Sequence, residues 1–198
     1  MSALFRSPLI VIDTETTGLL NDAQATPWEI AAVLLDEQGQ EVSTLGLIGR
    51  PDPWREDMRR IVALGGIDPD AVLAMAPIAE RRQELQGWLD AGLAGGARIT
   101  SFNVEFDATM LDRGRLVVAP KHWGPCIMSR AKKVMGPAGA LPWYRWLGDW
   151  KMPRLSEAAS FYGVPQQHPA HRALADARTA GLIACELQRR ALAAREAQ

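Results

Sequence analysis

The sequence predicts an α/β protein whose mixed β-sheet carries helices on both faces. Three apolar segments that suit strands come first, at residues 9–12, 28–35 and 42–48, and Gly39 provides a tight turn between the last two. A shorter strand is predicted at residues 98–102, among segments with helical spacing. Consecutive strands followed by an alternation of helices and strands favour a sheet with both antiparallel and parallel pairs.

The helices are predicted from apolar spacing and from residues that begin or end a helix. Asn103 is suited to cap a helix that runs to about Arg113, and Gly95 with Gly96 ends the helix before it. Residues 51–75 are rich in proline and glycine, which predicts a loop with short helices. The longer helices are expected at residues 78–93, 103–113, 127–135, 156–162 and 172–194.

Composition excludes several classes of protein. The chain has 198 residues, of which 47% are hydrophobic and 23% charged, as is typical of a single globular domain over residues 1–198. The net charge of −1 gives no overall attraction to nucleic acid, so such binding must use local patches. Cys126 and Cys185 form neither a disulfide framework nor a zinc pattern, which fits a reducing compartment. No apolar run suits a membrane span or a signal peptide, so we expect a cytoplasmic protein with no membrane partner.

Two acids stand at the end of the first predicted strand, in the segment SPLIVIDTETTGLL. Asp13 and Glu15 are two positions apart in an extended segment, so both carboxylates lie on one face of the sheet. Open α/β sheets place their functional sites at the carboxyl ends of strands. A buried pair of like charges is unfavourable unless something compensates it, which indicates a bound cation. A helix cap or a solvated turn is the alternative explanation.

Two further acids follow predicted elements in the same way. Asp107 lies one turn into the helix after the 98–102 strand, and Asp176 lies near the start of the last helix, five residues after His171. The four carboxylates and His171 can therefore converge on one edge of the sheet. Carboxylate oxygens suit Mg²⁺ or Mn²⁺ better than zinc, and two such ions about 3.5–4 Å apart activate water and hold a phosphate. The imidazole is suited to accept the proton of that water.

Taken one at a time, these residues have simpler explanations. Asp107 alone would be a surface acid of a helix, and His171 alone an exposed residue at a helix start. His168 is a nearby rival but lacks the spacing to Asp176, and His122 is expected in a loop without a role. Three more acids are expected to be structural or exposed, namely Asp22, Glu29 and Asp112.

Three segments in order, DTETTG, NVEFD and HRALADA, resemble the motifs of the DnaQ-like (DEDDh) 3′–5′ exonucleases, which include the proofreading ε subunit of DNA polymerase III, ribonuclease T and oligoribonuclease. The resemblance covers residues 8–188. It implies a ribonuclease H-like fold with a five-stranded mixed sheet, two Mg²⁺ ions for which Mn²⁺ can substitute, and release of nucleoside 5′-monophosphates. The implied metal ligands are Asp13, Glu15, Asp107 and Asp176.

The resemblance also implies roles for other residues. His171 would be the general base, with Glu15 as a second catalytic residue. Members often carry His at the position of Phe102, where we expect altered packing rather than lost catalysis. The implied substrate-binding residues are Thr14, Thr16, Thr17, Gly18, Leu19, Phe102, Asn103 and Phe106. Two prolines and a glycine in GVPQQHPA predict a mobile segment, so we expect His171 to approach the metals only when nucleic acid is bound.

A Trp-rich insert at about residues 139–155 separates the second and third motifs. It contains four aromatic residues beside three basic ones, in the segment GALPWYRWLGDWKMPRL. Bases stack on such aromatic side chains while cations contact the backbone. The alternatives are that these aromatic residues pack onto the domain or form an interface with a partner protein.

The function that we expect is metal-dependent 3′–5′ hydrolysis of single-stranded nucleic acid, with DNA as the first expectation for the substrate. One alternative is an oligoribonuclease or another RNA 3′-processing enzyme, because contact with a 2′-hydroxyl depends on pocket shape. The other is a non-catalytic nucleic-acid-binding subunit or a polymerase-associated proofreading subunit. The expected partners are single-stranded DNA or RNA 3′ ends and the nucleoside monophosphate product, with a homodimer or a polymerase partner left open.

Overall fold

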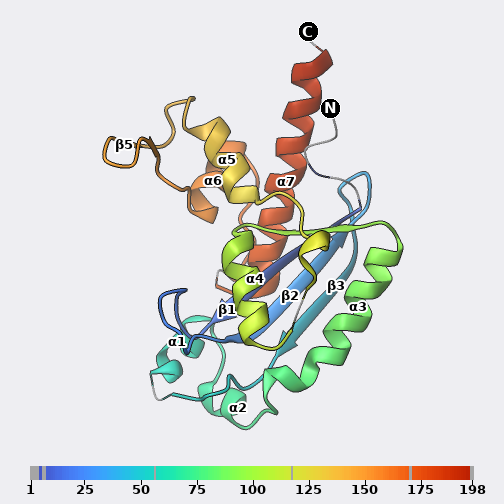
Figure 1. The fold of residues 1–198 in the computed structure, drawn as a ribbon, viewed down its shortest axis with the longest axis vertical. Helices are drawn as coiled ribbons and strands as arrows, with labels where there is room; N and C mark the ends of the chain where they lie inside the picture. The colour runs from blue at the N-terminus through green and yellow to red at the C-terminus, as the bar shows by residue number, and fades with distance from the viewer. Residues whose placement is uncertain (1–4, 6–7, 56, 117, 170, 197–198) are drawn as a thin grey trace.

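The computed structural model describes residues 5, 8–55, 57–116, 118–169 and 171–196, and it contains a mixed sheet with helices on both faces (Figure 1). The strand order is β3-β2-β1-β4, in which β1 is antiparallel to β2 and parallel to β4. The predicted fold class is therefore confirmed. The strands are β1 (Leu9–Thr16), β2 (Pro27–Leu35), β3 (Glu41–Ile48) and β4 (Arg98–Ser101).

The helices cover the sheet on both faces (Figure 1). A 3₁₀ turn, Ile78–Arg81, forms the first part of the helix that was predicted at residues 78–93, and the α-helix begins at Arg82. Within the described part of the chain, no helix is both long and apolar enough to cross a membrane. The α-helices are α1 (Met58–Leu64), α2 (Pro69–Leu73), α3 (Arg82–Ala94), α4 (Val104–Arg113), α5 (Ile127–Met135), α6 (Leu155–Tyr162) and α7 (Ala173–Glu196).

Strand β1 is central because its apolar residues are buried on both faces. Leu9 and Val11 belong to a core that the sheet forms with α5, α6 and α7. Ile10 and Ile12 belong to a second core on the opposite face, which includes Leu89 of α3 and residues of α4. The alternation follows from the two-residue period of a strand. A strand that is packed on both sides gives the acids that follow it a rigid base.

The sheet has four strands among the described residues, so the predicted count of five is wrong. Beyond β4, one parallel bridge joins Ile99 to Trp123, and no ladder extends from it in the described chain. Pro120 begins a short 3₁₀ turn there, and Pro125 has no N–H to donate to a neighbouring strand. This composition reduces the fifth strand position to a single bridge.

The Trp-rich insert forms a small hairpin apart from the main sheet. Its strands are β5 (Trp143–Tyr144) and β6 (Asp149–Trp150), which pair antiparallel. In Figure 1 the hairpin projects from the part of the molecule that contains α5 and α6. We call residues 143–150 the hairpin below.

Candidate active site

The first two acids lie at the carboxyl end of β1, beside the neighbouring strand β2. Asp13 pairs with Ala31 and Glu15 pairs with Glu29 in the antiparallel register. Asp13 and Glu15 are half-buried, whereas Thr14 between them is buried. The two carboxylates therefore leave the strand on one face, as the spacing predicted.

Asp107 reaches β1 from the first turns of α4. Asn103 stands at the N-cap position and its carbonyl accepts a hydrogen bond from the Asp107 N–H over 3.0 Å, although the Asn103 side chain makes no capping bond. The Asp107 side chain is only 3% exposed. Its Oδ1 accepts a hydrogen bond from Thr14 Oγ1 over 2.8 Å, which ties α4 to β1.

The start of α7 brings the remaining two residues to the same place. Glu15, His171 and Asp176 each offer one ligand atom, and these atoms lie within 4.8 Å of one another. His171 is exposed and has a backbone φ of 61°. It lies beside the acids in this structure, and its expected movement on substrate binding stays a prediction. His168, the rival in sequence, is exposed and is not a member of this group.

Burial is the largest influence on the electrostatics of the acids, and repulsion between neighbouring carboxylates adds to it at Asp13 and Glu15. Burial holds the pKa of Asp13 well above its usual range, and the charges of Asp107, Glu15 and Asp176 add to this effect. Burial likewise raises the pKa of Glu15 to about 7. Burial raises the pKa of Asp107 as well, although its hydrogen bond from Thr14 opposes the shift. Without added cations the cluster therefore holds its negative charge at a cost.

Asp176 shows most directly that the cluster fits a metal ion. Its Oδ1 is buried and has no hydrogen-bond partner among the described residues. Burial raises the pKa of Asp176, and the nearby His171 partly offsets that rise. A buried carboxylate oxygen without a partner is unfavourable unless it coordinates a cation. The donors are mainly carboxylate oxygens, which hard divalent cations prefer.

Sequence reasoning missed one ion pair beneath the site. Glu29 was expected to be structural or exposed, and it is 3% exposed with its carboxylate against Arg172. Glu29 faces Glu15 across the β1–β2 ladder, and its charge contributes to the raised pKa values of Asp13 and Glu15. Arg172 opposes the shift at Glu15. The adjacency of Arg172 to His171 was the only signal in the sequence.

The loop after β1 is held in place by two arginines. Arg55 pairs with Asp22 over 2.7 Å and also donates to the carbonyl of Thr17. Arg113 of α4 donates to the carbonyls of Leu20 and Asp22, over 2.9 and 2.6 Å. These contacts give the segment that follows the acids a defined shape before any ligand binds.

The substrate-binding candidates in this loop differ in whether they are available to a ligand. Thr17 is buried, and its Oγ1 accepts a hydrogen bond from the Thr26 N–H over 3.0 Å. Thr16 donates to the carbonyl of Gly18 over 2.8 Å, so both hydroxyl groups have partners within the protein. Leu19 is 69% exposed and is free to cover a ligand.

The substrate-binding candidates near α4 also differ in their exposure. Phe102 is buried in the core that β1 forms with α5, α6 and α7, which explains how a phenyl ring is accommodated at a motif position where His is common in the family. Thr14 is buried against Asp107. Asn103 and Phe106 are half-buried at the start of α4. Core packing therefore explains the position of Phe102, and the hydrogen bond to Asp107 explains that of Thr14, without contact to a ligand.

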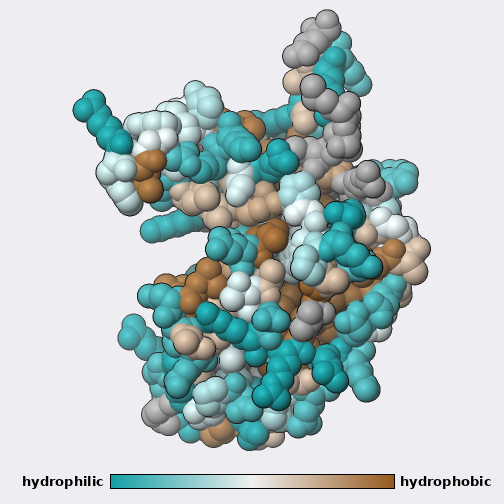
Figure 2. All heavy atoms as spheres, viewed as in Figure 1, coloured by the Kyte–Doolittle hydropathy of each residue, from teal (hydrophilic) through white to brown (hydrophobic). Residues whose placement is uncertain are grey.

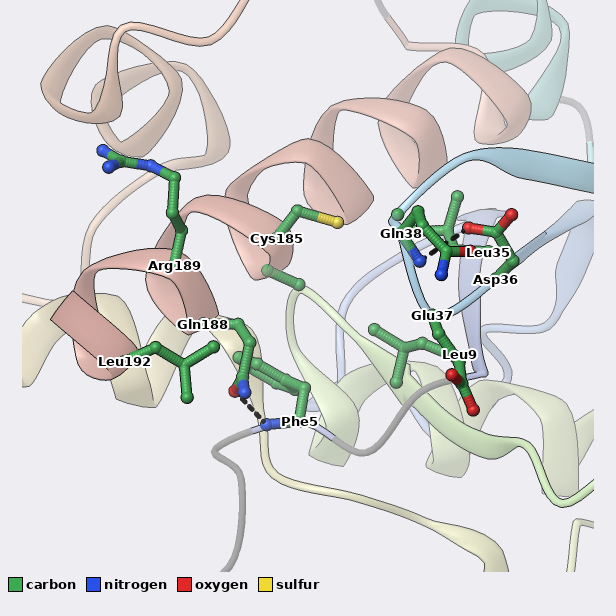
Figure 3. Close-up of a pocket in the computed structure, with 12 residues that line it drawn as sticks. Phe5, Leu9, Leu35, Asp36, Glu37, Gln38, Cys185, Gln188, Arg189 and Leu192 are labelled. Carbon is green, nitrogen blue, oxygen red and sulfur yellow. Dashed lines mark hydrogen bonds between the residues drawn. The ribbon is translucent and has the colours of Figure 1, made fainter. Parts of the chain in front are cut away.

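An apolar pocket lies at the other end of β1, away from the acids (Figure 3). Leu9 begins β1 and Leu35 ends β2, and both side chains face this pocket together with Cys185 of α7. Burial raises the pKa of the Cys185 thiol, so its sulfur is poorly suited to act as a nucleophile. Asp36 and Glu37, which follow β2, also line the pocket, and none of the four acids of the cluster does.

The fold and the acid cluster at the edge of its sheet belong to a known class of protein, the exonucleases. Residues 10–184 match the model of the exonuclease (RNase_T) family, and the chain belongs to that family of hydrolases. By sequence alone, no curated protein is similar enough to this chain to count as a match.

Solved nuclease structures share the fold at low sequence identity. The nuclease domain of 3′hExo, a DEDDh family member bound to rAMP, has a TM-score of 0.69 at 17% identity, with 92% of each chain covered. Cell-death related nuclease 4 (CRN-4) has a TM-score of 0.71 at 16% identity, with 93% of this chain and 64% of that chain covered. E. coli Exonuclease I with a dA16 oligonucleotide has a TM-score of 0.66 at 20% identity, with 93% and 41% covered. The chain thus spans less than two thirds of the length of CRN-4 and of Exonuclease I.

Proposed function

We propose that this chain is a divalent-metal-dependent 3′–5′ exonuclease that hydrolyses single-stranded nucleic acid to nucleoside 5′-monophosphates. The observation that carries the proposal is the convergence of Glu15, His171 and Asp176 beside Asp13 and Asp107. Membership of the exonuclease family supports the reaction class. The presence of all four acids and the histidine argues against a non-catalytic binding subunit.

Asp13, Glu15, Asp107 and Asp176 would hold the metal ions in this proposal. The unpartnered Oδ1 of Asp176 and the mutual repulsion of the acids support the assignment. Two ions of Mg²⁺ or Mn²⁺ would supply charge neutralisation for the phosphate and would make water a better nucleophile. Thr14 supports Asp107 through its hydrogen bond, which fixes the direction of one carboxylate oxygen.

His171 would act as the general base. It is exposed at the edge of the cluster, where its ring can meet both solvent and a bound strand. In its neutral form the imidazole accepts a proton from the attacking water and later releases it to solvent. Asp176 and Glu15 lie close enough to stabilise the imidazolium that forms, because their carboxylates carry the opposite charge.

The loop of residues 16–19 would receive the 3′-terminal nucleotide. The exposed Leu19 offers an apolar surface to a base, and the loop backbone is held by Arg55 and Arg113. Two solved structures with this fold are 3′-exonucleases, which supports the polarity. The neighbours bind both a deoxyribose and a ribose ligand, namely the dA16 oligonucleotide in E. coli Exonuclease I and the nucleotide rAMP in 3′hExo.

The test is digestion of matched DNA and RNA oligonucleotides, each labelled at the 5′ end, with Mg²⁺, Mn²⁺ or EDTA. The proposal predicts a ladder of 5′-labelled fragments that shorten one nucleotide at a time, with 5′-monophosphates as products. A phosphate on the 3′-hydroxyl should protect the strand. Release of the 5′ label in the first step, or equal digestion in EDTA, would contradict the proposal. Comparison of kcat/KM for DNA and RNA then identifies the preferred sugar.

A further inference from the structure

We propose that the hairpin is a base-stacking platform, centred on Trp146, that holds the single strand upstream of its 3′ end. The proposal rests on the proposed nuclease function and adds a second contact region to it. The starting observation is exposure. Trp146 is 80% exposed and Trp143 is 48% exposed, whereas large aromatic side chains are normally mostly buried.

The hairpin is held firmly at its base. Two strands of two residues each are not stable alone in water, so the protein must anchor them. Trp150 packs onto the core and against Gly136, where an added Cβ would lie 2.4 Å from its ring. Lys132 of α5 forms an ion pair with Asp149, and Lys151 pairs with Glu157 of α6 over 2.5 Å.

The aromatic residues of the hairpin form two sets, one that packs at its base and one that stacks at its tip. Trp150 is half-buried and serves packing, with the Trp143 ring edge-on to it at 4.9 Å between centroids. Tyr144 and Trp146 stack on each other instead, with centroids 6.0 Å apart and ring planes inclined by 23°. The packing explanation of the insert therefore holds for Trp150 and does not extend to Trp146. A rigid, exposed, flat surface is what a nucleobase stacks on.

The charge of the insert favours nucleic acid over an apolar partner. Residues 139–155 contain three basic residues and one acid, in a chain with a net charge of −1. That acid, Asp149, is paired with Lys132. Arg145 lies between the two stacked rings in sequence, is exposed, and has no ion-pair partner in the described part of the chain. A cation next to exposed rings matches a phosphate next to a base.

The hairpin lies beside an indentation in the molecular surface. Figure 1 places the hairpin on the same side of the molecule as the loop after β1, with α4 between them along that side. The outline in Figure 2 is notched between the part that carries the hairpin and the part that carries α1 and this loop. Since α4 carries Asp107, a strand whose 3′ end reaches the acids can continue along the notch to the hairpin.

The experiment measures binding without hydrolysis. Fluorescence anisotropy of a 5′-labelled single strand of about 20 nucleotides, and of a dinucleotide, is recorded with the full chain in an Asp13→Asn background. Trp146→Ala should weaken binding of the long strand by about tenfold and leave the dinucleotide unchanged, because only the long strand reaches the hairpin. Trp146→Phe should retain most of the affinity, since it keeps an aromatic face.

Leu147→Ala is the matched control, because Leu147 lies on the same tip, is 55% exposed and cannot stack. It should leave the affinity for both strands unchanged. A scan that places one abasic site at successive positions should find positions where base removal and Trp146→Ala are not additive. That result locates the stacked base.

Three results would overturn the proposal. Unchanged long-strand affinity in Trp146→Ala would show that Trp146 does not contact the strand. An equal loss of affinity in Leu147→Ala would show that the contact is a general apolar one and not stacking. Loss of self-association in Trp146→Ala with unchanged strand affinity would assign the hairpin to a contact between copies of the chain. The proposed function fails separately, if the wild-type chain degrades no oligonucleotide while anisotropy still reports the hairpin contact.

Discussion

Arg172 donates a hydrogen bond from its Nε to each carboxylate oxygen of the buried Glu29, over 3.1 Å in both cases. The pair joins the start of α7 to β2, and 143 positions separate the two residues. Arg172 directly follows His171, whose φ of 61° is unusual for a residue with a side chain. We infer that the pair fixes the backbone that presents His171 to the acids.

Arg172→Ala should therefore reduce both stability and turnover. It leaves Glu29 buried without a partner, and because Arg172 is itself 29% exposed, the expected loss is about 2–3 kcal/mol in the free energy of unfolding. The kcat should fall more than KM rises, because His171 loses its anchor while the strand-binding surfaces remain. Urea unfolding and steady-state kinetics measure the two effects.

Arg178→Ala is the matched control for that change. Arg178 also lies on α7 and pairs with a glutamate, Glu41, but both side chains are exposed by more than a third. Exposed pairs contribute about 0–1 kcal/mol. Equal losses of stability in the two variants would show that Glu29 does not need its partner.

Asp13→Asn should stabilise the metal-free protein while it abolishes activity. Burial and the neighbouring acids hold the pKa of Asp13 well above its usual range, so removal of its charge relieves repulsion in the folded state. In EDTA at pH 8 we expect the Tm to rise by a few degrees, which is about 1 kcal/mol or more for a chain of this size. Thermal unfolding checks this, and a lower Tm would contradict the electrostatic account.

The pH dependence of the metal-free protein follows from the same shifts. The folded-state pKa of Glu15 is raised to about 7, and those of Asp13, Asp107 and Asp176 are also raised. Between the unfolded pKa values of about 4 and the folded values, the folded state binds more protons. Stability from these groups is therefore present at low pH and is lost as pH rises toward 7 or above. The Tm difference between Asp13→Asn and the wild type should shrink at pH 5.

Mg²⁺ or Mn²⁺ should reverse this loss. An ion that binds only the folded state stabilises it by about 2.7 kcal/mol at a concentration one hundred times its Kd. We expect the Tm to rise with millimolar metal at pH 8, and we expect Asp176→Asn to remove most of the rise because it removes the negative charge of the carboxylate that carries the unpartnered Oδ1. Glu41→Gln, which changes an exposed acid outside the cluster, should retain the full rise.

Local patterns were sufficient for most of the architecture. Strands β1, β2 and β3 were predicted from their apolar runs, and α4 was predicted from Asn103, which is suited to cap a helix. The prediction of a fifth strand was wrong because strand pairing depends on a partner that is distant in sequence. Pro120 and Pro125 limit that pairing to one bridge.

The four acids were predicted to converge because each lies near the end of a predicted strand or the start of a predicted helix, and the structure brings them to one edge of the sheet. Glu29 was missed because its environment comes from Glu15 across the ladder and from Arg172 at the other end of the chain. A single sequence does not contain that proximity. The split of the Trp-rich insert into the packed Trp150 and the exposed Trp146 likewise depends on Gly136, whose missing side chain leaves room for the Trp150 ring.

The attacking water must lose a proton, and His171 is placed to accept it. His171→Ala should lower kcat by about 10²–10⁴-fold, which is the usual contribution of a general base. The Tm rise with Mg²⁺ should remain nearly unchanged, because four carboxylates rather than the imidazole hold the metal. His168→Ala is the matched control, since His168 is exposed in the same segment and lies outside the acid group. It should keep wild-type kcat. If His171→Ala loses the metal-dependent Tm rise as fully as Asp176→Asn does, then His171 is a metal ligand and not the base.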